Sequence, residues 1–352
     1  MLTDGNKELS ILVAGPTPPP LGGTTVLFER LVHGLDARDD LSVRTLDTGG
    51  VRHKGLAGVS RLLRLLSAVD REARTQDVVT LHVSTSGLHV LGPPVAWLAR
   101  RRSTPLIIRK FGGTDFLEYS SLRRGLIMWA LRRADLYLAE TKELVRVARD
   151  AGFSNADWYP NSRPMPELPD ASLREEGCRR FVFLGQIHSG KGIRELLDAS
   201  DGLPAGATVS IFGTLGFDVA ESDFAGRRRV SYRGPVSPKD VHRVLSEHDA
   251  LVLPSHHHGE GYPGVILEAY AAGLPVISTR WRAIPELVEE DVTGLLVPPY
   301  EAETLRLAMV ALFESVELYA RLREGVRARR DQYSDVVWQD RFVDYCRRVA
   351  GE

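Results

Sequence analysis

Short apolar runs alternate with amphipathic stretches along the whole chain, and this alternation predicts its architecture. In the first half, the apolar run Leu9–Ala14 is followed by Gly15–Gly23, a loop rich in proline and glycine. The next segment, Thr25–Leu35, carries its apolar side chains at helical spacing. Further predicted strands, with helices between them, are Val78–Val83, Pro105–Ile108 and Leu136–Ala139. Strands that alternate with helices indicate parallel βαβ units in a doubly wound sheet.

The same pattern restarts in the second half of the chain. The proline-rich segment Asn161–Gly177 is predicted as a linker between domains. We therefore expect an N-terminal Rossmann-like domain over residues 1–165, joined by a C-terminal helix at about 335–352, and a second one over residues 178–334. The predicted strands of the second domain are Arg180–Leu184, Thr208–Phe212, Ala250–Pro254, Pro275–Ser278 and Thr293–Val297, and its predicted helices are Ile193–Ala199, Val265–Ala272 and a tail from Glu301 to about Val349.

Composition narrows the class of protein but names no partner. A net charge of -1 gives no reason to expect nucleic acid as a partner. The cysteines Cys178 and Cys346 lie far apart and suggest a reducing compartment. The segment Met1–Ser10 is polar and does not resemble a signal peptide, so we expect a cytoplasmic protein.

The stretch Val78–Ala99 carries no Asp, Glu, Lys or Arg and has the length of a membrane span. Serines, glycines and two prolines interrupt its middle, which a spanning helix would not favour. We interpret the stretch as a buried strand, a loop, and then a helix that begins near Pro93.

Two glutamates bracket the most informative segment, with Glu260 on a predicted loop and Glu268 inside the helix that follows. Gly261 and Gly264 lie near the start of that helix, where exposed N–H groups and the helix dipole favour an anion such as a diphosphate. One carboxylate would accept hydrogen bonds from a sugar and the other from a ribose. The alternative is a solvated loop glutamate and an unrelated helix-surface glutamate.

The segment from Glu260 to Glu268 resembles the E-x7-E motif of the retaining GT-B glycosyltransferases, known as group 1 or glycosyltransferase family 4. The similarity continues in order through Ala271–Ile277, Ile284–Glu286 and Thr293–Pro298. The resemblance implies two Rossmann-like domains that face each other across a cleft, with a nucleoside-diphosphate sugar as donor substrate bound by the second domain. It implies that Glu260 contacts the sugar and Glu268 the ribose, with donor contacts also from Gly261, Tyr262, Pro263, Gly264 and Val265.

A second glycine-rich loop, Gly185–Gly192, places Lys191 at the predicted start of a helix. A lysine there can neutralise charge that develops on a leaving diphosphate, although a Gly-x-Lys sequence alone is often a plain turn. The family carries an arginine and a lysine in this loop; Lys191 fits, and Gln186 stands in place of the arginine. Arg280 or Arg282 could supply the second positive charge. The resemblance also places Gly213, after a predicted strand, in the nucleotide-base region.

Two sites in the first half complete the resemblance. Gly22 and Gly23 match a glycine pair that lets the backbone approach the donor phosphate and the acceptor. In Gly112–Asp115 the family's histidine is replaced by Gly112, while Asp115 remains to orient an acceptor hydroxyl. His82 and His89 are candidate substitutes for that histidine, although a lone histidine is more often structural.

We expect no bound metal ion, because the chain lacks an Asp-x-Asp pair and because the consecutive residues His256–His258 point in different directions. Arginine clusters at Arg100–Arg102, Arg123–Arg124 and Arg132–Arg133 leave two interpretations open. The apolar turn Gly125–Leu131 either belongs to a core helix with solvated ends or docks peripherally on the anionic inner face of a membrane.

The function that the family resemblance implies is sugar transfer by a retaining hexosyltransferase without a cofactor. The acceptor would be a hydroxyl of a glycan or of a lipid-linked acceptor, in the biosynthesis of glycans, exopolysaccharides or glycolipids. Lys191, Glu260 and Asp115 are the predicted catalytic residues. The main alternative is a non-catalytic, nucleotide-binding subunit of a complex, suggested by Gln186 and Gly112. A phosphorylase, a sugar-nucleotide epimerase and a dehydrogenase are further rivals; the loop after the first strand lacks the dinucleotide fingerprint that a dehydrogenase would need.

Overall fold

The computed structural model describes residues 8–20, 22–49, 56–168 and 177–352 of the chain. The segment Met1–Ser10 therefore lies mostly outside the described residues, as does the second half of the predicted linker. The chain divides into two compact units, which are Met1–Asn161 with Asp335–Glu352, and Ser162–Ser334.

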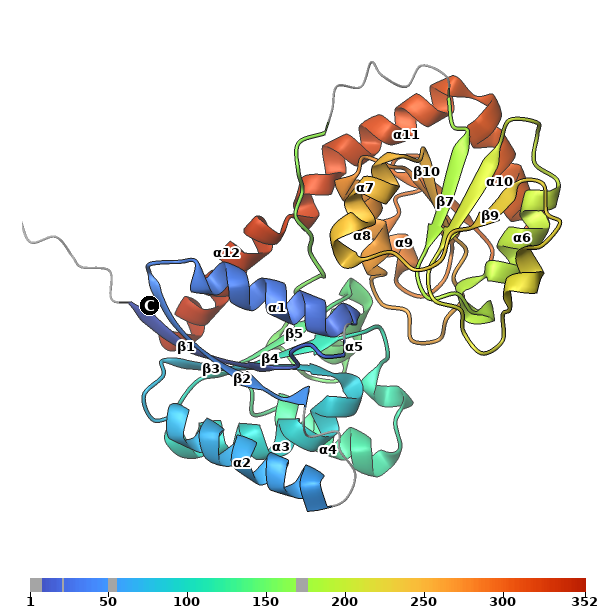
Figure 1. The fold of residues 1–352 in the computed structure, drawn as a ribbon. Helices are drawn as coiled ribbons and strands as arrows, with labels where there is room; N and C mark the ends of the chain where they lie inside the picture. Colours follow the sequence, from blue (N-terminus) through green and yellow to red (C-terminus); the bar gives the residue numbers. More distant parts are fainter. Residues whose placement is uncertain (1–7, 21, 50–55, 169–176) are drawn as a thin grey trace, which may run out of the picture. The chain divides into compact units, whose positions relative to one another are not determined.

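The first unit is a parallel sheet of six strands in the order β2-β1-β3-β4-β5-β6 (Figure 1). The buried residues of its strands alternate between two cores, because successive side chains of a strand point to opposite faces. Its strands are β1 (Leu9–Gly15), β2 (Leu41–Asp47), β3 (Val78–Ser84), β4 (Leu106–Phe111), β5 (Leu136–Ala139) and β6 (Ala156–Trp158).

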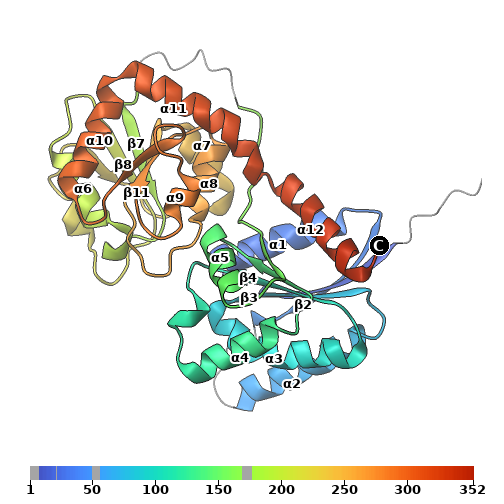
Figure 2. The same cartoon turned by 180° about the vertical axis from the view of Figure 1, so that it is seen from behind.

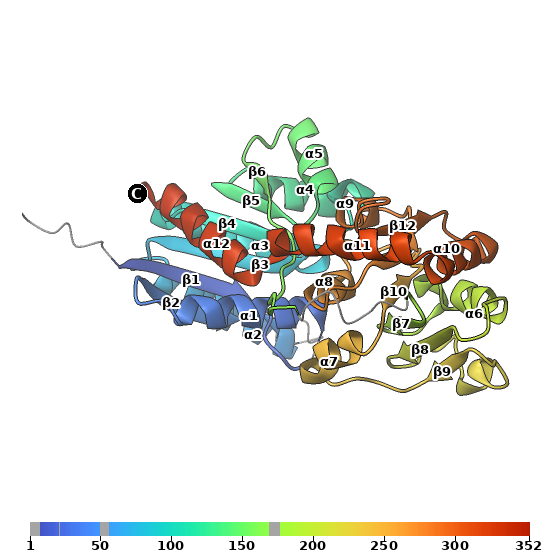
Figure 3. The same cartoon turned by 90° about the horizontal axis from the view of Figure 1, so that it is seen from above.

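Helices cover both faces of this sheet. On one face, α1 (Gly23–Asp36) and α12 (Asp335–Ala350) pack together around Phe28 and Phe342 (Figure 3). On the other face lie α2 (Leu56–Glu72), α3 (Thr85–Arg102) and α4 (Ser121–Leu131), in that order (Figures 1 and 2). The short 3-10 helix η2 (Phe116–Glu118) precedes α4, and α5 (Lys142–Asp150) follows β5.

The second unit repeats the architecture with strand order β12-β11-β10-β7-β8-β9, again all parallel. Its strands are β7 (Arg180–Leu184), β8 (Thr208–Phe212), β9 (Val230–Tyr232), β10 (Ala250–Leu253), β11 (Val276–Thr279) and β12 (Gly294–Val297). Its α-helices are α6 (Ile193–Asp201), α7 (Val241–Ser246), α8 (Gly264–Ala271), α9 (Ile284–Leu287), α10 (Ala302–Glu314) and α11 (Val316–Arg329). Its 3-10 helices are η4 (Ser189–Lys191), η5 (Glu221–Phe224), η6 (Pro238–Asp240) and η7 (Arg330–Tyr333). The prediction of two doubly wound, Rossmann-like units is confirmed.

The sequence-based boundary of α3 is wrong. The helix begins at Thr85 and contains Pro93 and Pro94 within it, so there is no loop between β3 and Pro93. Leu88, Leu91 and Val95 keep helical spacing across the prolines and are buried, and this burial outweighs the backbone hydrogen bonds that proline removes. No helix in the described part of the chain is long and apolar enough to span a membrane.

Two further boundaries differ from the sequence analysis. Strand β4 extends to Phe111, so that Arg109 and Lys110 are buried strand residues rather than the start of a loop. The predicted helical tail is interrupted at Ser315, which caps α11 through its side chain, and again at Ser334 before α12. The second interruption lies at the boundary between the two units.

Candidate functional site

In each sheet the strand order reverses at one point, and such a switch point is where open α/β sheets bind ligands. In the second unit the reversal lies between the adjacent strands β7 and β10. The loop Gly185–Gly192 leaves β7, and the loop Pro254–Glu260 leaves β10. Two predicted site residues, Lys191 and Glu260, lie on these loops and are therefore brought to the same place.

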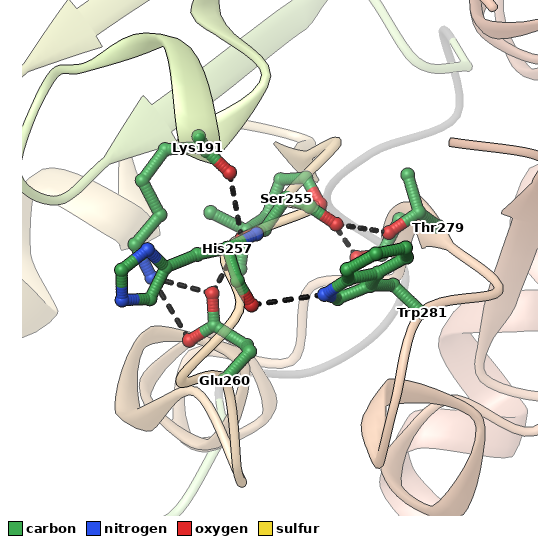
Figure 4. Close-up of polar contacts among 9 residues, drawn as sticks. Lys191, Ser255, His257, Glu260, Thr279 and Trp281 are labelled. Carbon is green, nitrogen blue, oxygen red and sulfur yellow. Dashed lines mark hydrogen bonds and ion pairs between the residues drawn. The ribbon is translucent and has the colours of Figure 1, made fainter. Parts of the chain in front are cut away.

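Lys191 and Glu260 form a buried ion pair there (Figure 4). The Lys191 ammonium donates to both carboxylate oxygens of Glu260, at 2.8 Å and 2.6 Å. The Ser255 hydroxyl, which sequence reasoning missed, donates to the same carboxylate. The side chain of Glu260 is 7% exposed and that of Lys191 18%, so the charges are paired in a site with little water.

The two loops are held together by their backbones. The His256 N–H donates to the Gly190 carbonyl at 2.9 Å. Gly192 has a φ of +73°, and a Cβ there would lie 2.0 Å from the Pro254 carbonyl oxygen. The glycine is therefore needed both for its backbone conformation and for the close approach that delivers Lys191 to Glu260.

Two histidines line the same site and remain neutral beside the lysine. Burial lowers the pKa of His188 and of His257, and the positive charge of Lys191 lowers both further. Their rings meet edge to face at 5.4 Å. The His257 carbonyl also accepts a hydrogen bond from the Trp281 indole at 2.9 Å, which fixes the loop (Figure 4).

Glu268 lies on α8 and is paired with an arginine that sequence analysis assigned to a linker. The Arg163 guanidinium donates to Glu268 at 2.9 Å, and the Arg163 side chain is only 6% exposed. Gly264 makes room for it, because a Cβ at that position would lie 2.1 Å from Arg163 Nη2. Nothing in the local sequence around Arg163 indicates this contact, since Glu268 lies 105 residues further along the chain.

The remaining predicted donor residues between Glu260 and Glu268 lie at the start of α8. Gly261, Tyr262 and Pro263 are buried at the entry to α8, and the Tyr262 hydroxyl turns inward to donate to Glu286 at 2.6 Å. Gly264 and Val265 form the first turn of α8, half-buried, with N–H groups that no capping side chain satisfies. An anion at this helix start would therefore be bound by backbone rather than by side chains.

Gln186 is exposed beside β7, and the arginines considered as replacements for its charge are engaged elsewhere. Arg280 forms an ion pair with Glu290, and Arg282 donates to the His258 ring. Gly213 has a φ of +148° and follows β8, where a Cβ would lie 1.7 Å from the Gly185 carbonyl oxygen. This glycine therefore lets two strand-end loops touch.

The three consecutive histidines have separate neighbours. The His256 ring packs on Tyr300 at 4.1 Å, His257 faces His188, and His258 accepts from Arg282. Within the described residues, no group of three or more His, Cys, Asp or Glu side chains is arranged to hold a metal ion.

The first unit has its switch point between the adjacent strands β1 and β3, and a pocket of about 640 Å³ opens there. It is lined by Gly22, Gly23 and their neighbours after β1, and by the end of β3 with the start of α3. Asp47 at the end of β2 shapes its rim by accepting the N–H groups of Thr17 and Gly49. The two predicted glycines thus border a real cavity.

His82, from β3, lies at the wall of this pocket and is fully buried. Burial holds its pKa well below the ordinary value, and the nearby Arg109 lowers the pKa further. Its Nε2 atom contacts the Thr80 hydroxyl at 3.2 Å, while Nδ1 has no partner among the described residues. His89, the other candidate, lies in α3 and is not among the pocket residues.

The turn Gly112–Asp115 leaves β4 and is held by two buried charged residues. Lys110 donates to the Gly112 carbonyl at 2.7 Å, and the Gly112 N–H donates to Glu140 at 2.7 Å. Burial lowers the pKa of Lys110 to about 8, against the opposing effect of Glu140. Gly112 has a φ of +88°, a conformation that disfavours a histidine. Asp115 caps η2 by accepting the Leu117 N–H at 2.9 Å.

The known proteins that this chain resembles include several glycosyltransferases. Residues 178–315 match the family model described as glycosyl transferases group 1. The chain is similar to D-rhamnosyltransferase WbpZ of Pseudomonas aeruginosa, at 29% identity over 50% of this chain and 46% of that protein. It is also similar to sulfoquinovosyl transferase SQD2 of Arabidopsis thaliana, at 27% identity over 73% of this chain and 57% of the relative. The chain thus spans about half the length of these curated relatives.

Among solved structures, the fold is similar to that of HepE from Anabaena, solved in complex with UDP. The TM-score is 0.76, with 96% of this chain and 99% of the other covered at 18% sequence identity. At this identity the likeness establishes the fold alone. Together with the two six-stranded parallel sheets, it confirms the GT-B fold class.

Proposed function

We propose that this chain transfers a sugar from a nucleoside-diphosphate sugar to an acceptor hydroxyl, with retention at the anomeric carbon, because residues 178–315 match the family model of group 1 glycosyl transferases. The sugar is a hexose or a derivative of one, and the acceptor is a glycan or a lipid-linked glycan precursor. The names of the relatives, a rhamnosyltransferase and a sulfoquinovosyl transferase, support this class of reaction.

The observation that carries the proposal is the ion pair between Lys191 and Glu260 at the β7/β10 switch point. A diphosphate that enters this site competes with Glu260 for the Lys191 ammonium. Glu260 is then released from the pair and can accept hydrogen bonds from sugar hydroxyls. As the bond between the sugar and the diphosphate breaks, negative charge grows on the leaving group, and Lys191 stabilises it in a site that excludes water.

The first turn of α8 supports the same location for the diphosphate. Its N–H groups and the positive end of the helix dipole attract an anion, and Gly264 lets the backbone approach closely. Glu268 lies one turn further along the helix and is held in place by Arg163, which leaves its carboxylate fixed for a ribose hydroxyl. The arginine is thus proposed as a positioning residue for Glu268.

The acceptor side is proposed to be the 640 Å³ pocket of the first unit. Hydroxyl groups of Thr17, Thr24 and Ser86 line it together with the apolar side chains of Val83, Val90 and Leu91. A sugar ring, which has hydroxyls on its rim and C–H groups on its faces, suits such a mixture. Asp115 lies in the turn after β4 and is not among the residues that line this pocket; it stays the proposed residue for orienting the acceptor hydroxyl.

A non-catalytic, nucleotide-binding subunit is the second candidate. It is favoured by the exposed Gln186, which adds no charge where the family has an arginine, and by Arg280 being paired with Glu290. A subunit of this kind would bind nucleotide sugar without turning it over.

A thermal-shift panel of UDP-, GDP- and ADP-sugars separates these functions when combined with an assay for nucleoside diphosphate release. An enzyme should be stabilised by one of the donors and should release the diphosphate when an acceptor extract is added. Stabilisation without release, with any acceptor extract, would favour the subunit. No shift with any donor would contradict both.

A further inference from the structure

Exposed apolar side chains gather on the outer surface of the three helices that cover one face of the first sheet. In the described part of the chain, thirteen large apolar side chains are exposed, and six of them belong to α2, α3 and α4. These are Val59, Leu63, Val90, Trp97, Leu122 and Leu126. The three helices lie side by side (Figures 1 and 2), and each of them contributes two of the six exposed side chains.

The exposed apolar side chains on α4 are not those that the sequence pattern indicated. Of the turn Gly125–Leu131, the side chains of Ile127, Ala130 and Leu131 point into the core. Leu122 and Leu126, four residues apart on one helix face, are instead exposed by 74% and 37%. The apolar turn therefore marks the buried side of the helix.

The same surface is strongly basic. The helices α2, α3 and α4 carry eight arginines and two acidic residues, Asp70 and Glu72, which gives a net charge of +6. Five of these arginines have no carboxylate partner among the described residues: Arg64, Arg100, Arg101, Arg123 and Arg124. By contrast, arginines of the second unit such as Arg227, Arg243 and Arg306 are each paired with Asp or Glu.

The combination of apolar and unpaired basic side chains selects the partner. A second copy of this chain, docked through the same surface, would bring two like charges of +6 together, which disfavours a symmetric dimer. A nucleic acid would neutralise the arginines but leave leucines such as Leu122 in water. An anionic bilayer satisfies both, since headgroups pair with arginine and the acyl boundary takes the leucines.

We propose that the α2–α4 surface, defined by these six apolar side chains and five arginines, docks the protein on a bilayer that contains anionic lipid. Leu122 and Leu126 enter the acyl boundary, and Arg123 and Arg124 beside them pair with lipid phosphates. Val90 belongs both to this surface and to the wall of the pocket at the β1/β3 switch point. A lipid-linked acceptor would therefore reach the pocket from the membrane, a step that rests on the proposed function, whereas docking itself does not.

The test is co-sedimentation of the full chain with phosphatidylcholine vesicles, with and without phosphatidylglycerol. The wild type should sediment only with the phosphatidylglycerol vesicles, and less so as salt is raised. The double variant Leu122→Asp with Leu126→Asp should bind at least about tenfold more weakly, a change of about 1.4 kcal/mol. Replacing Arg123 or Arg124 by Gln should weaken binding about fivefold each.

Leu307→Asp is the matched control, because Leu307 is 52% exposed on α10 in the second unit. It should bind vesicles like the wild type, and all variants should keep the donor-induced thermal shift. Binding that ignores phosphatidylglycerol, or an equal loss in the Leu307 variant, would overturn the proposal. The proposal would also be overturned if the protein bound a single-stranded RNA oligomer and this binding depended on the arginines alone. The partner of the surface would then be a polyanion and not a bilayer. If no nucleotide sugar raised the melting temperature of the wild type, only the proposed reaction would be contradicted.

Discussion

The two switch points of this protein share a topology but differ in chemistry. In the second unit the loops after β7 and β10 close on each other through Lys191, Glu260 and Ser255, so that the site is filled by paired charge. In the first unit the loops after β1 and β3 leave a pocket of about 640 Å³ with a neutral, buried His82 at its wall. The doubly wound sheet decides where a ligand binds, and the loop residues decide which kind.

This difference suits the two substrates of the proposed transfer reaction. A charged diphosphate needs a positive group to bind it. In the preformed ion pair, Lys191 can give up the Glu260 carboxylate and bind the diphosphate instead. A sugar acceptor needs volume and hydrogen-bonding groups rather than charge. Substitutions at the paired site and at the open site should therefore have effects of different size and kind.

The largest effect is expected at the ion pair. Lys191→Met should lower kcat by an amount equivalent to about 2–4 kcal/mol of activation free energy. The reason is that the Lys191 ammonium no longer stabilises the charge on the leaving diphosphate. The substitution should also lower the free energy of unfolding by about 3 kcal/mol, because the buried Glu260 carboxylate is left unpaired.

The double variant Lys191→Met with Glu260→Gln distinguishes the two losses. Removing the carboxylate charge should restore most of the stability measured by urea unfolding, while activity stays low. If the double variant recovered activity along with stability, Lys191 would act only through folding.

A smaller effect is expected at the first turn of α8. Gly264→Ala should lower the free energy of unfolding by about 1–3 kcal/mol, because its Cβ collides with Arg163 and displaces it from Glu268. The Michaelis constant for the donor should rise with it. Gly125→Ala on α4 is the matched control: a Cβ there meets nothing within 4 Å, and the change should stabilise by about 0.5–1 kcal/mol. Equal stability of both variants would argue against a role for Gly264 in seating Arg163.

The smallest effect concerns the open site and its pH dependence. The folded-state pKa of His82 lies well below 6.5, so the unfolded state binds one more proton below that pH. Stability should therefore fall as pH drops below about 6.5, with His82 contributing at most about 1.4 kcal/mol per pH unit. His82→Gln should reduce the slope of unfolding free energy against pH over this range, by the amount that corresponds to about one bound proton. Parallel curves for the variant and the wild type would show that the ring is already solvated.

The C-terminal half illustrates how far local sequence carries a prediction. The glycines at the start of α8, the glutamates on either side and the glycine loop before Lys191 are all sequence-local, and together they are enough to predict a donor site in this half. The Tyr262–Glu286 hydrogen bond gives a structural reason for part of the same pattern. By contrast, the partner of Glu268 is Arg163, which lies 105 residues away in the chain.

The first half was harder to predict because burial there overrides local signals. Two prolines suggested a helix start at Pro93, but the buried stripe through Leu88 and Leu91 extends the helix back to Thr85. The predicted strand ended at Ile108, but Arg109 and Lys110 also lie within β4, with their charges buried. The turn Gly125–Leu131 left a core helix and a docking helix both open, and burial of Ile127, Ala130 and Leu131 decides for the core.

The sequence by itself determined the alternation of strands and helices, the two units and the family motif, because these depend on spacing and residue type along a single segment. Only the tertiary structure decided that Lys191 meets Glu260, that Arg163 holds Glu268, and that a pocket opens beside His82. These contacts join strands or loops whose neighbours in space are set by sheet order. A switch in that order brings together residues that no local pattern relates.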